Sequence, residues 1–127
     1  MAYNVLIVDD SKLARMAVAK GLNTLRPGWT RVEATNADEA LALAKQTAVD
    51  IALLDFNMPG RDGLSLAADI RELNPNIVVA LISANVQQEI LDRTAQVGGL
   101  FLAKPLTEAA LDTFLLAAEA RLNASKP

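Results

Sequence analysis

Short runs of apolar residues alternate with longer amphipathic stretches along the chain. Three of the five apolar runs are nearly continuous, which is typical of parallel strands that are covered on both faces. The predicted strands are residues 5–8, 31–34, 51–54, 77–82 and 99–102. Apolar positions at helical spacing predict helices over about 11–25, 64–73, 86–97 and 107–122, and one more that starts near residue 36.

Residues that start and stop helices flank these stretches. Ser11 is placed to cap the first helix, and Asn36-Ala-Asp-Glu39 has the spacing of a capping box ahead of the second. Pro27-Gly28 stands where the first helix is expected to end. The resulting order, βαβαβαβαβα with short connections, predicts an α/β fold with an open, doubly wound parallel sheet. Because no linker, repeat or low-complexity segment interrupts it, residues 1–127 are expected to form a single domain.

The amino-acid composition argues against some classes of function. Hydrophobic residues make up 52% of the 127 residues, which is enough for a packed core. The 15 acidic residues outnumber the 12 Lys and Arg and give a net charge of -3, whereas nucleic-acid-binding domains usually carry the opposite bias. Direct nucleic-acid binding is therefore not expected. The first residues do not resemble a signal peptide and no apolar window is long enough for a membrane span, which predicts a cytoplasmic protein without membrane insertion.

The chain contains neither Cys nor His. This argues against a zinc site and excludes nucleophiles of the Ser-His-Asp and Cys-His types. Any metal ion must therefore bind to oxygen ligands.

Polar residues stand where the predicted strands end. Asp9 and Asp10 follow the first strand, Asp55 the third, Ser83 the fourth and Lys104 the fifth. Each of them alone has a structural interpretation, as a helix cap, a turn residue or a solvated lysine. In a doubly wound sheet, however, all five converge on the edge where such folds place their chemistry.

Three carboxylates at one edge require a cation or raised pKa values, because they cannot all stay ionised in a partly dry cleft. Mg²⁺ suits such oxygen ligands. Asp55 is then a candidate nucleophile toward a phosphoryl donor. The incoming negative charge would be bound by Mg²⁺, the Lys104 ammonium and the Ser83 hydroxyl.

The same residues carry a family resemblance. The chain resembles the receiver domain of two-component response regulators in the order and spacing of Asp9-Asp10, Asp55-Phe-Asn-Met-Pro-Gly-Arg-Asp-Gly63, Ser83-Ala84 and Phe101-Leu-Ala-Lys-Pro105. The resemblance covers essentially the whole chain. It implies a flavodoxin-like sheet of five parallel strands in the order 2-1-3-4-5, and it favours a stand-alone receiver of the chemotaxis or phosphorelay type.

The resemblance also implies a role for each residue of the set. Asp55 is the expected site of phosphorylation. The expected ligands of Mg²⁺ are Asp9, Asp10, Asp55 and the backbone carbonyl of Asn57. Lys104 is expected to pair first with Asp55 and then with the phosphoryl group. Ser83 is expected to donate to a phosphoryl oxygen while Phe101 swings inward, and the peptide bond between Lys104 and Pro105 is expected to be cis.

A chain without His cannot supply its own phosphohistidine. The expected donors are a sensor histidine kinase, a histidine phosphotransfer protein or a small phosphodonor. Phosphorylation is expected to switch a surface of the fourth helix, fifth strand and fifth helix, which binds a downstream target protein. Such a protein is a signalling switch that catalyses only its own phosphoryl transfer and dephosphorylation.

The first helix carries a candidate partner-binding residue. At about 100° per residue, its predicted core face consists of Ala14, Ala17, Val18, Gly21, Leu22 and Leu25. Met16 then points away from the core, and its predicted neighbours are Lys12, Ala19, Lys20 and Asn23. An exposed Met with basic neighbours suits a kinase or phosphotransfer partner. The alternative is an isolated exposed Met, which is common on protein surfaces.

The last helix has a similar division. Its predicted core stripe consists of Leu111, Phe114, Leu115, Ala118 and Leu122. The opposite face carries no charge and consists of Ala109, Thr113, Leu116, Ala117 and Ala120. Such a face indicates an interface, with Leu116 as its candidate contact for a target or a dimer partner. The alternative is the ordinary preference of Ala for helices.

Three other interpretations stay open. An aspartate-nucleophile phosphohydrolase has a related fold, but it needs an Asp-x-Asp arrangement on the first strand, and the two acids here are adjacent. A degenerate receiver that acts only as a scaffold is disfavoured by the complete set of five residues. The chain could also be the receiver of a longer regulator.

Overall fold

The structure is a computed structural model that describes residues 2–124, in which five parallel strands alternate with five helices. The strands are β1 (Asn4–Val8), β2 (Thr30–Ala34), β3 (Ile51–Asp55), β4 (Val78–Ser83) and β5 (Leu100–Ala103). The helices are α1 (Lys12–Leu25), α2 (Ala37–Gln46), α3 (Gly63–Leu73), α4 (Gln88–Gln96) and α5 (Glu108–Ala124). The strand order is β2-β1-β3-β4-β5, so the predicted fold class and strand order are confirmed.

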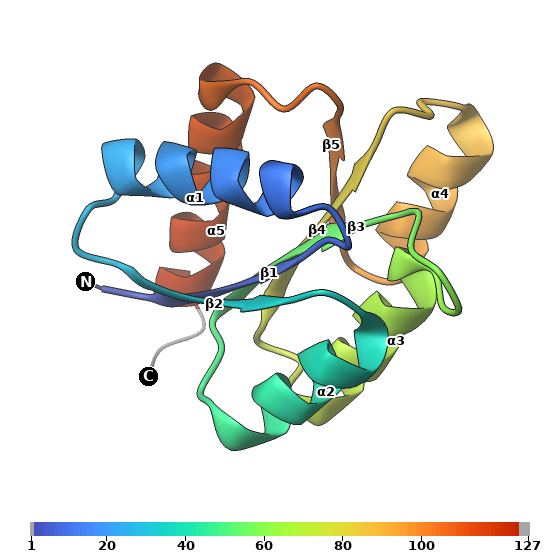
Figure 1. Cartoon of the computed structure of the whole chain (residues 1–127), viewed down its shortest axis with the longest axis horizontal. Helices are drawn as coiled ribbons and strands as arrows, with labels where there is room; N and C mark the ends of the chain where they lie inside the picture. Colours follow the sequence, from blue (N-terminus) through green and yellow to red (C-terminus); the bar gives the residue numbers. More distant parts are fainter. Residues whose placement is uncertain (1, 125–127) are drawn as a thin grey trace.

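Helices cover both faces of the sheet (Figure 1). The side chains of α1 and α5 pack on one face with Ile51 and Leu53 of β3. Those of α2 and α3 pack on the other face with Ala52 and Leu54, and α4 contacts β5 at the edge of the sheet. All five residues of β3 are buried, which explains why its sequence before Asp55 is a continuous apolar run rather than an alternating one.

The core stripe of α1 differs from the prediction at two positions. Val18 and Leu22 are buried as expected, but Ala19 is also buried and Ala17 is exposed. The prediction was wrong there because a helical wheel assumes one flat contact surface, whereas α1 packs on the sheet and beside α5 at the same time. The two helices approach closely at Gly21, where an added Cβ would lie 2.8 Å from the Cδ2 atom of Leu111.

The prediction for α5 is confirmed. The buried residues of this helix are Leu111, Phe114, Leu115, Ala118 and Leu122. The uncharged residues on its opposite face are all exposed, and Leu116 is among the most exposed large apolar residues that the structure describes. Met16 on α1 is exposed as well, as predicted.

The helix caps follow the sequence with one difference. Ser11 caps α1 by accepting a hydrogen bond from the N–H of Ala14, and Asn36 caps α2 by accepting one from the N–H of Glu39. The carboxylate of Glu39 does not return to Asn36, as in a full capping box, but accepts from the N–H and hydroxyl of Thr35. Between residues 2 and 124, no helix is long and apolar enough to cross a membrane.

Candidate functional site

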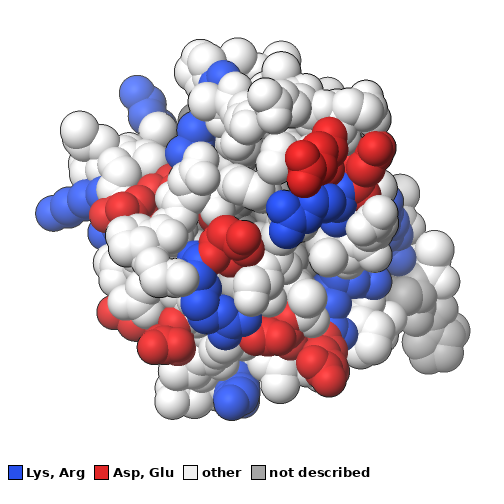
Figure 2. Space-filling view, turned by 90° about the vertical axis from the view of Figure 1, so that its right-hand side faces the viewer, with Lys and Arg blue, Asp and Glu red and all other residues white. Residues whose placement is uncertain are grey.

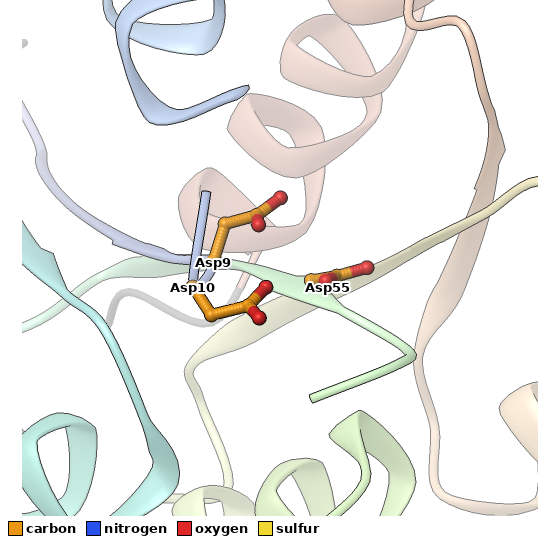
Figure 3. A group of neighbouring side chains, drawn as sticks. All are labelled: Asp9, Asp10 and Asp55. Atoms are coloured by element: carbon orange, nitrogen blue, oxygen red, sulfur yellow. The ribbon is translucent and has the colours of Figure 1, made fainter. Parts of the chain in front are cut away.

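The register of the central strands brings the acidic residues together. Val8 of β1 is paired with Leu54 of β3, so the residues that follow them, Asp9 and Asp55, are neighbours at the carboxyl edge of the sheet. One carboxylate oxygen from each of Asp9, Asp10 and Asp55 lies within 4.8 Å of the others. Figure 3 shows Asp9 and Asp10 directly after β1, with Asp55 beside them at the end of β3. The structure thus brings together the three carboxylates that the sequence singles out.

The three carboxylates differ in their exposure. Asp9 is 8% exposed and Asp55 is 4% exposed, whereas Asp10 is open to solvent. Burial raises the pKa of Asp9 above its ordinary value of 3.8, and the charge of Asp55 raises it further. The N–H of Ser11, which donates to Oδ1 of Asp9 at 2.9 Å, acts in the opposite direction. Two buried carboxylates beside a third, exposed one favour the binding of a cation.

Lys104 supplies a positive charge to the site. Its Nζ atom donates a hydrogen bond to Oδ1 of Asp55 at 2.9 Å and lies 3.9 Å from Oδ2 of Asp9. The backbone holds it there, because the N–H of Lys104 donates to the carbonyl of Ser83 at 2.9 Å, and the bond to Pro105 is cis as expected. The single ammonium therefore contacts two of the three carboxylates and offsets one negative charge.

The remaining predicted residues surround this group. Ser83 is buried at the end of β4, and its Oγ atom accepts a hydrogen bond from the N–H of Asn85 at 3.0 Å. Phe101 is half-buried on the neighbouring strand β5. The side chain of Asn57 is exposed, while its N–H donates to Oδ1 of Asp55 at 3.4 Å. Within the described part of the chain, no hydrogen bond joins the Ser83 hydroxyl to the carboxylates.

Arg15 and Gly63 both hold the site, and only Arg15 was not identified from the sequence. Arg15 donates from Nη1 to the carbonyl of Asp9 at 2.7 Å. At Gly63, an added Cβ would lie 2.5 Å from the carbonyl oxygen of Asp55, so this position requires glycine. The only sequence signal for Arg15 is an Arg one turn into the first helix, which does not indicate this contact, whereas Gly63 belongs to the motif that follows Asp55.

The donor set fits Mg²⁺. The three clustered groups are carboxylates, and hard divalent cations prefer oxygen ligands of this kind. Figure 2 views the carboxyl edge of the sheet and shows acidic and basic side chains interspersed there. The arrangement can therefore hold a divalent cation beside a buried carboxylate and a lysine.

A groove of about 740 Å³ opens beside the site, between α1 and the connection from β5 to α5. Asp9 and Lys104 line the end nearest the carboxylates. The other walls are largely formed by small and apolar residues, among them Ala14, Ala17, Gly21, Pro105 and Leu106. Ala17 is exposed because it faces this groove rather than the core.

Comparison with known proteins agrees with this geometry. Residues 5–115 match the model of the response regulator receiver domain. The positive alginate biosynthesis regulatory protein of Pseudomonas aeruginosa is 40% identical over 129 aligned positions, which cover 98% of this chain and 48% of that protein. The sensor protein EvgS of Escherichia coli is 34% identical over 88% of this chain and 9% of that protein. The chain thus spans less than half of the length of either relative.

A solved structure shows the same fold. The chemotaxis protein CheY4 of Vibrio cholerae superimposes with a TM-score of 0.84 at 26% identity, covering 93% of this chain and 99% of that one.

Proposed function

The chain belongs to the response regulator receiver domain family, and on this premise we propose that Asp55 accepts a phosphoryl group in the presence of Mg²⁺. One observation carries this proposal: three carboxylates lie within 4.8 Å of one another, with the ammonium of Lys104 at 2.9 Å from Asp55. A structural ion pair would need one carboxylate rather than three. The excess of negative charge favours a bound cation, and the bound cation then favours an anionic substrate.

The chemistry is a phosphoryl transfer. One carboxylate oxygen of Asp55 attacks phosphorus, so an O–P bond forms while the bond between phosphorus and the leaving group breaks. The leaving group is acetate when the donor is acetyl phosphate and imidazole when it is a phosphohistidine. Mg²⁺ supplies positive charge that screens the carboxylates from the approaching anion.

Two side chains are placed to bind the transferred group. Lys104 has a flexible stem and is partly exposed, so its ammonium moves from Asp55 to a phosphoryl oxygen. The Oγ atom of Ser83 already accepts from Asn85, which leaves its own proton free to donate to the phosphoryl group. Phe101 then moves toward the space that the Ser83 hydroxyl leaves, and this links the site to β5.

Labelling by a small donor tests the proposal. The protein is mixed with acetyl phosphate and Mg²⁺, and the intact mass followed by peptide mapping should show one phosphoryl group on Asp55. Asp55→Asn and removal of Mg²⁺ should each abolish the labelling, while the exposed acid Asp38 on α2 provides a matched control as Asp38→Asn. Undiminished labelling of Asp55→Asn contradicts the proposal. Absence of labelling contradicts it when beryllofluoride, a mimic of the phosphoryl group that is not hydrolysed, also fails to bind.

We also propose that the protein removes its own phosphoryl group. Asn57 and Asn85 flank the site and are both exposed, which leaves water a path to the phosphorus atom. Loss of label after the donor is removed should therefore proceed without another protein, and it should require Mg²⁺.

The proposed donor protein is a histidine kinase or a histidine phosphotransfer protein that docks over α1. Met16 is exposed there, and Leu13, one turn earlier on the same helix, is 79% exposed. Each is followed in the sequence by a residue that lines the groove beside Lys104, Ala14 after Leu13 and Ala17 after Met16. Met16→Ala and Leu13→Ala should slow transfer from a phosphohistidine partner but leave labelling by acetyl phosphate unchanged. The proposed surface for a downstream target includes Leu116 on α5.

A further inference from the structure

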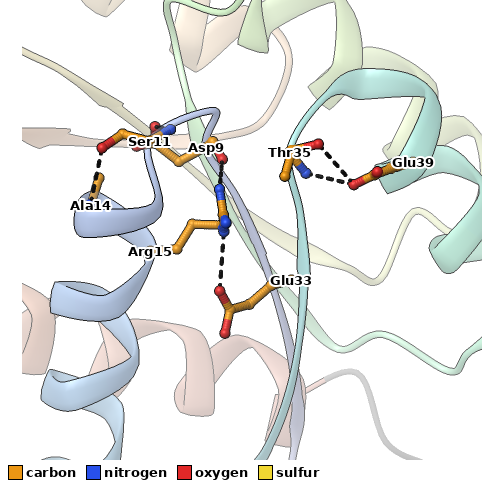
Figure 4. Close-up of polar contacts among 7 residues, drawn as sticks. All are labelled: Asp9, Ser11, Ala14, Arg15, Glu33, Thr35 and Glu39. Atoms are coloured by element: carbon orange, nitrogen blue, oxygen red, sulfur yellow. Dashed lines mark hydrogen bonds and ion pairs between the residues drawn. The ribbon is translucent and has the colours of Figure 1, made fainter.

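Arg15 lies between the acidic site and β2. Its side chain is only 13% exposed, and its Nε atom pairs with Oε1 of Glu33 at 3.1 Å. Its Nη1 atom donates to the carbonyl of Asp9 at 2.7 Å. Figure 4 shows the guanidinium between these two partners. One planar group thus links the backbone of the acidic site to a carboxylate on the neighbouring strand.

The carbonyl that Arg15 contacts has a special place in the chain. It belongs to the peptide group between Asp9 and Asp10, and this group is planar. Fixing its oxygen therefore fixes the direction in which the chain continues to Asp10. Asp9 itself is held by its N–H, which donates to the carbonyl of Ala34 at 3.2 Å, and by the N–H of Ser11 at its carboxylate. The orientation of this peptide group sets where the Cα atom of Asp10 lies, and therefore the region that its exposed carboxylate reaches.

Glu33 determines where the guanidinium stays. An unpaired arginine beside three carboxylates would turn to them and compete with a divalent cation for their oxygens. The ion pair with Glu33 holds Arg15 on the carbonyl instead, and it also cancels the charge of Arg15. The pair therefore orients the site without adding net positive charge to it.

We propose that Arg15 is a positioning residue for the cation site, and that Glu33 keeps its guanidinium away from the carboxylates. The inference rests on the proposed function, because it concerns the same Mg²⁺ site. The inference predicts the direction in which the Mg²⁺ affinity changes when Arg15 is replaced. If Arg15 acted only through its charge, removing it would tighten Mg²⁺ binding. If it positions Asp10, removing it weakens Mg²⁺ binding.

The test measures Mg²⁺ affinity directly. Mg²⁺ is added stepwise to ¹⁵N-labelled protein without a phosphodonor, and the amide shifts of the site report the Kd. Arg15→Gln should weaken binding by about tenfold, which is typical of residues that orient metal ligands. Arg15→Lys should weaken it similarly, because a single ammonium keeps the charge but does not reach both partners. Glu33→Gln should also weaken it.

Lys12→Gln is the matched control. It removes one positive charge from the first turn of the same helix, where Lys12 is exposed, and should leave the affinity unchanged or higher. Thermal unfolding without Mg²⁺ is measured for every variant. If folded Arg15→Gln binds Mg²⁺ as tightly as the wild type or more tightly, whatever its Tm, the inference is overturned but the proposed function is not. A wild-type protein that binds no Mg²⁺ would overturn the proposed function and the inference with it.

Discussion

Neutralising one carboxylate of the site is expected to stabilise the metal-free protein. Asp10 is the exposed member of the group, and one of its oxygens lies within 4.8 Å of oxygens of Asp9 and Asp55. Lys104 contacts the other two carboxylates. Asp10→Asn keeps the shape of the side chain and removes its charge, so it relieves repulsion without opening a cavity.

The distance sets the size of the effect. At 4.8 Å, the upper limit of the separation between these oxygens, two unit charges repel by roughly 3.5 kcal/mol at an effective dielectric constant near 20, and by roughly 0.9 kcal/mol at that of water. The lower value applies to Asp10, because its carboxylate is exposed and Lys104 offsets part of the charge. The repulsion of Asp10 by Asp9 and Asp55 together therefore lowers the free energy of unfolding by about 1–2 kcal/mol. For a domain of this size, that corresponds to a rise in Tm of roughly 5 °C.

Urea unfolding followed by circular dichroism measures this difference. The wild-type protein and Asp10→Asn are compared with EDTA and again with excess Mg²⁺. Bound Mg²⁺ stabilises the folded wild type, by about 2.7 kcal/mol at a hundred times its Kd. Asp10→Asn has lost one ligand of Mg²⁺, so Mg²⁺ should raise its free energy of unfolding by less. Its advantage in EDTA should therefore shrink or reverse when Mg²⁺ is present.

A matched variant and two outcomes make the comparison decisive. Glu72 is an exposed acid at the end of α3, and Glu72→Gln should change the free energy of unfolding by no more than about 0.5 kcal/mol. If Asp10→Asn is less stable than the wild type in EDTA, repulsion does not dominate the site. If both proteins gain equally from Mg²⁺, Asp10 is not a ligand.

Three further predictions follow from individual contacts. Burial raises the pKa of Asp9 above 3.8, so in metal-free buffer its contribution to stability is complete below pH 3.8 and is lost as the pH rises through the folded-state pKa. Asp9→Asn should flatten this part of the pH dependence of the urea midpoint. Gly63→Ala should lower the free energy of unfolding by about 1–3 kcal/mol, measured by urea unfolding, because its Cβ would meet the backbone of Asp55. Trp29 packs edge-on against Tyr3, with ring centroids 5.2 Å apart, before the first residue of β2 and away from the carboxyl edge. Its fluorescence should not respond to Mg²⁺, and saturable quenching would contradict this placement.

Much of the site could be predicted from the sequence, because it follows from local patterns and one rule of topology. A strand such as β3 that is buried on both faces excludes polar residues until it ends, so Asp55 marks its end. Parallel strands with helical crossovers all end on the same edge, and this places Asp9, Ser83 and Lys104 near Asp55 without any knowledge of distances. The exposed Met16 and Leu116 follow from helical spacing alone.

The approach of one element to another was decided only by the tertiary structure. Arg15 and Glu33 meet although they are 18 positions apart in the sequence, because α1 begins shortly after β1 and the strand paired with β1 is β2, which carries Glu33. Ala17 and Ala19 exchange their predicted environments because α1 contacts the sheet and α5 at once. A periodic pattern records which side of a helix is apolar, but it does not contain the angle or distance at which the helix meets its neighbours. The contacts that orient the carboxylates depend on that angle and distance, and so they appear only in the folded chain.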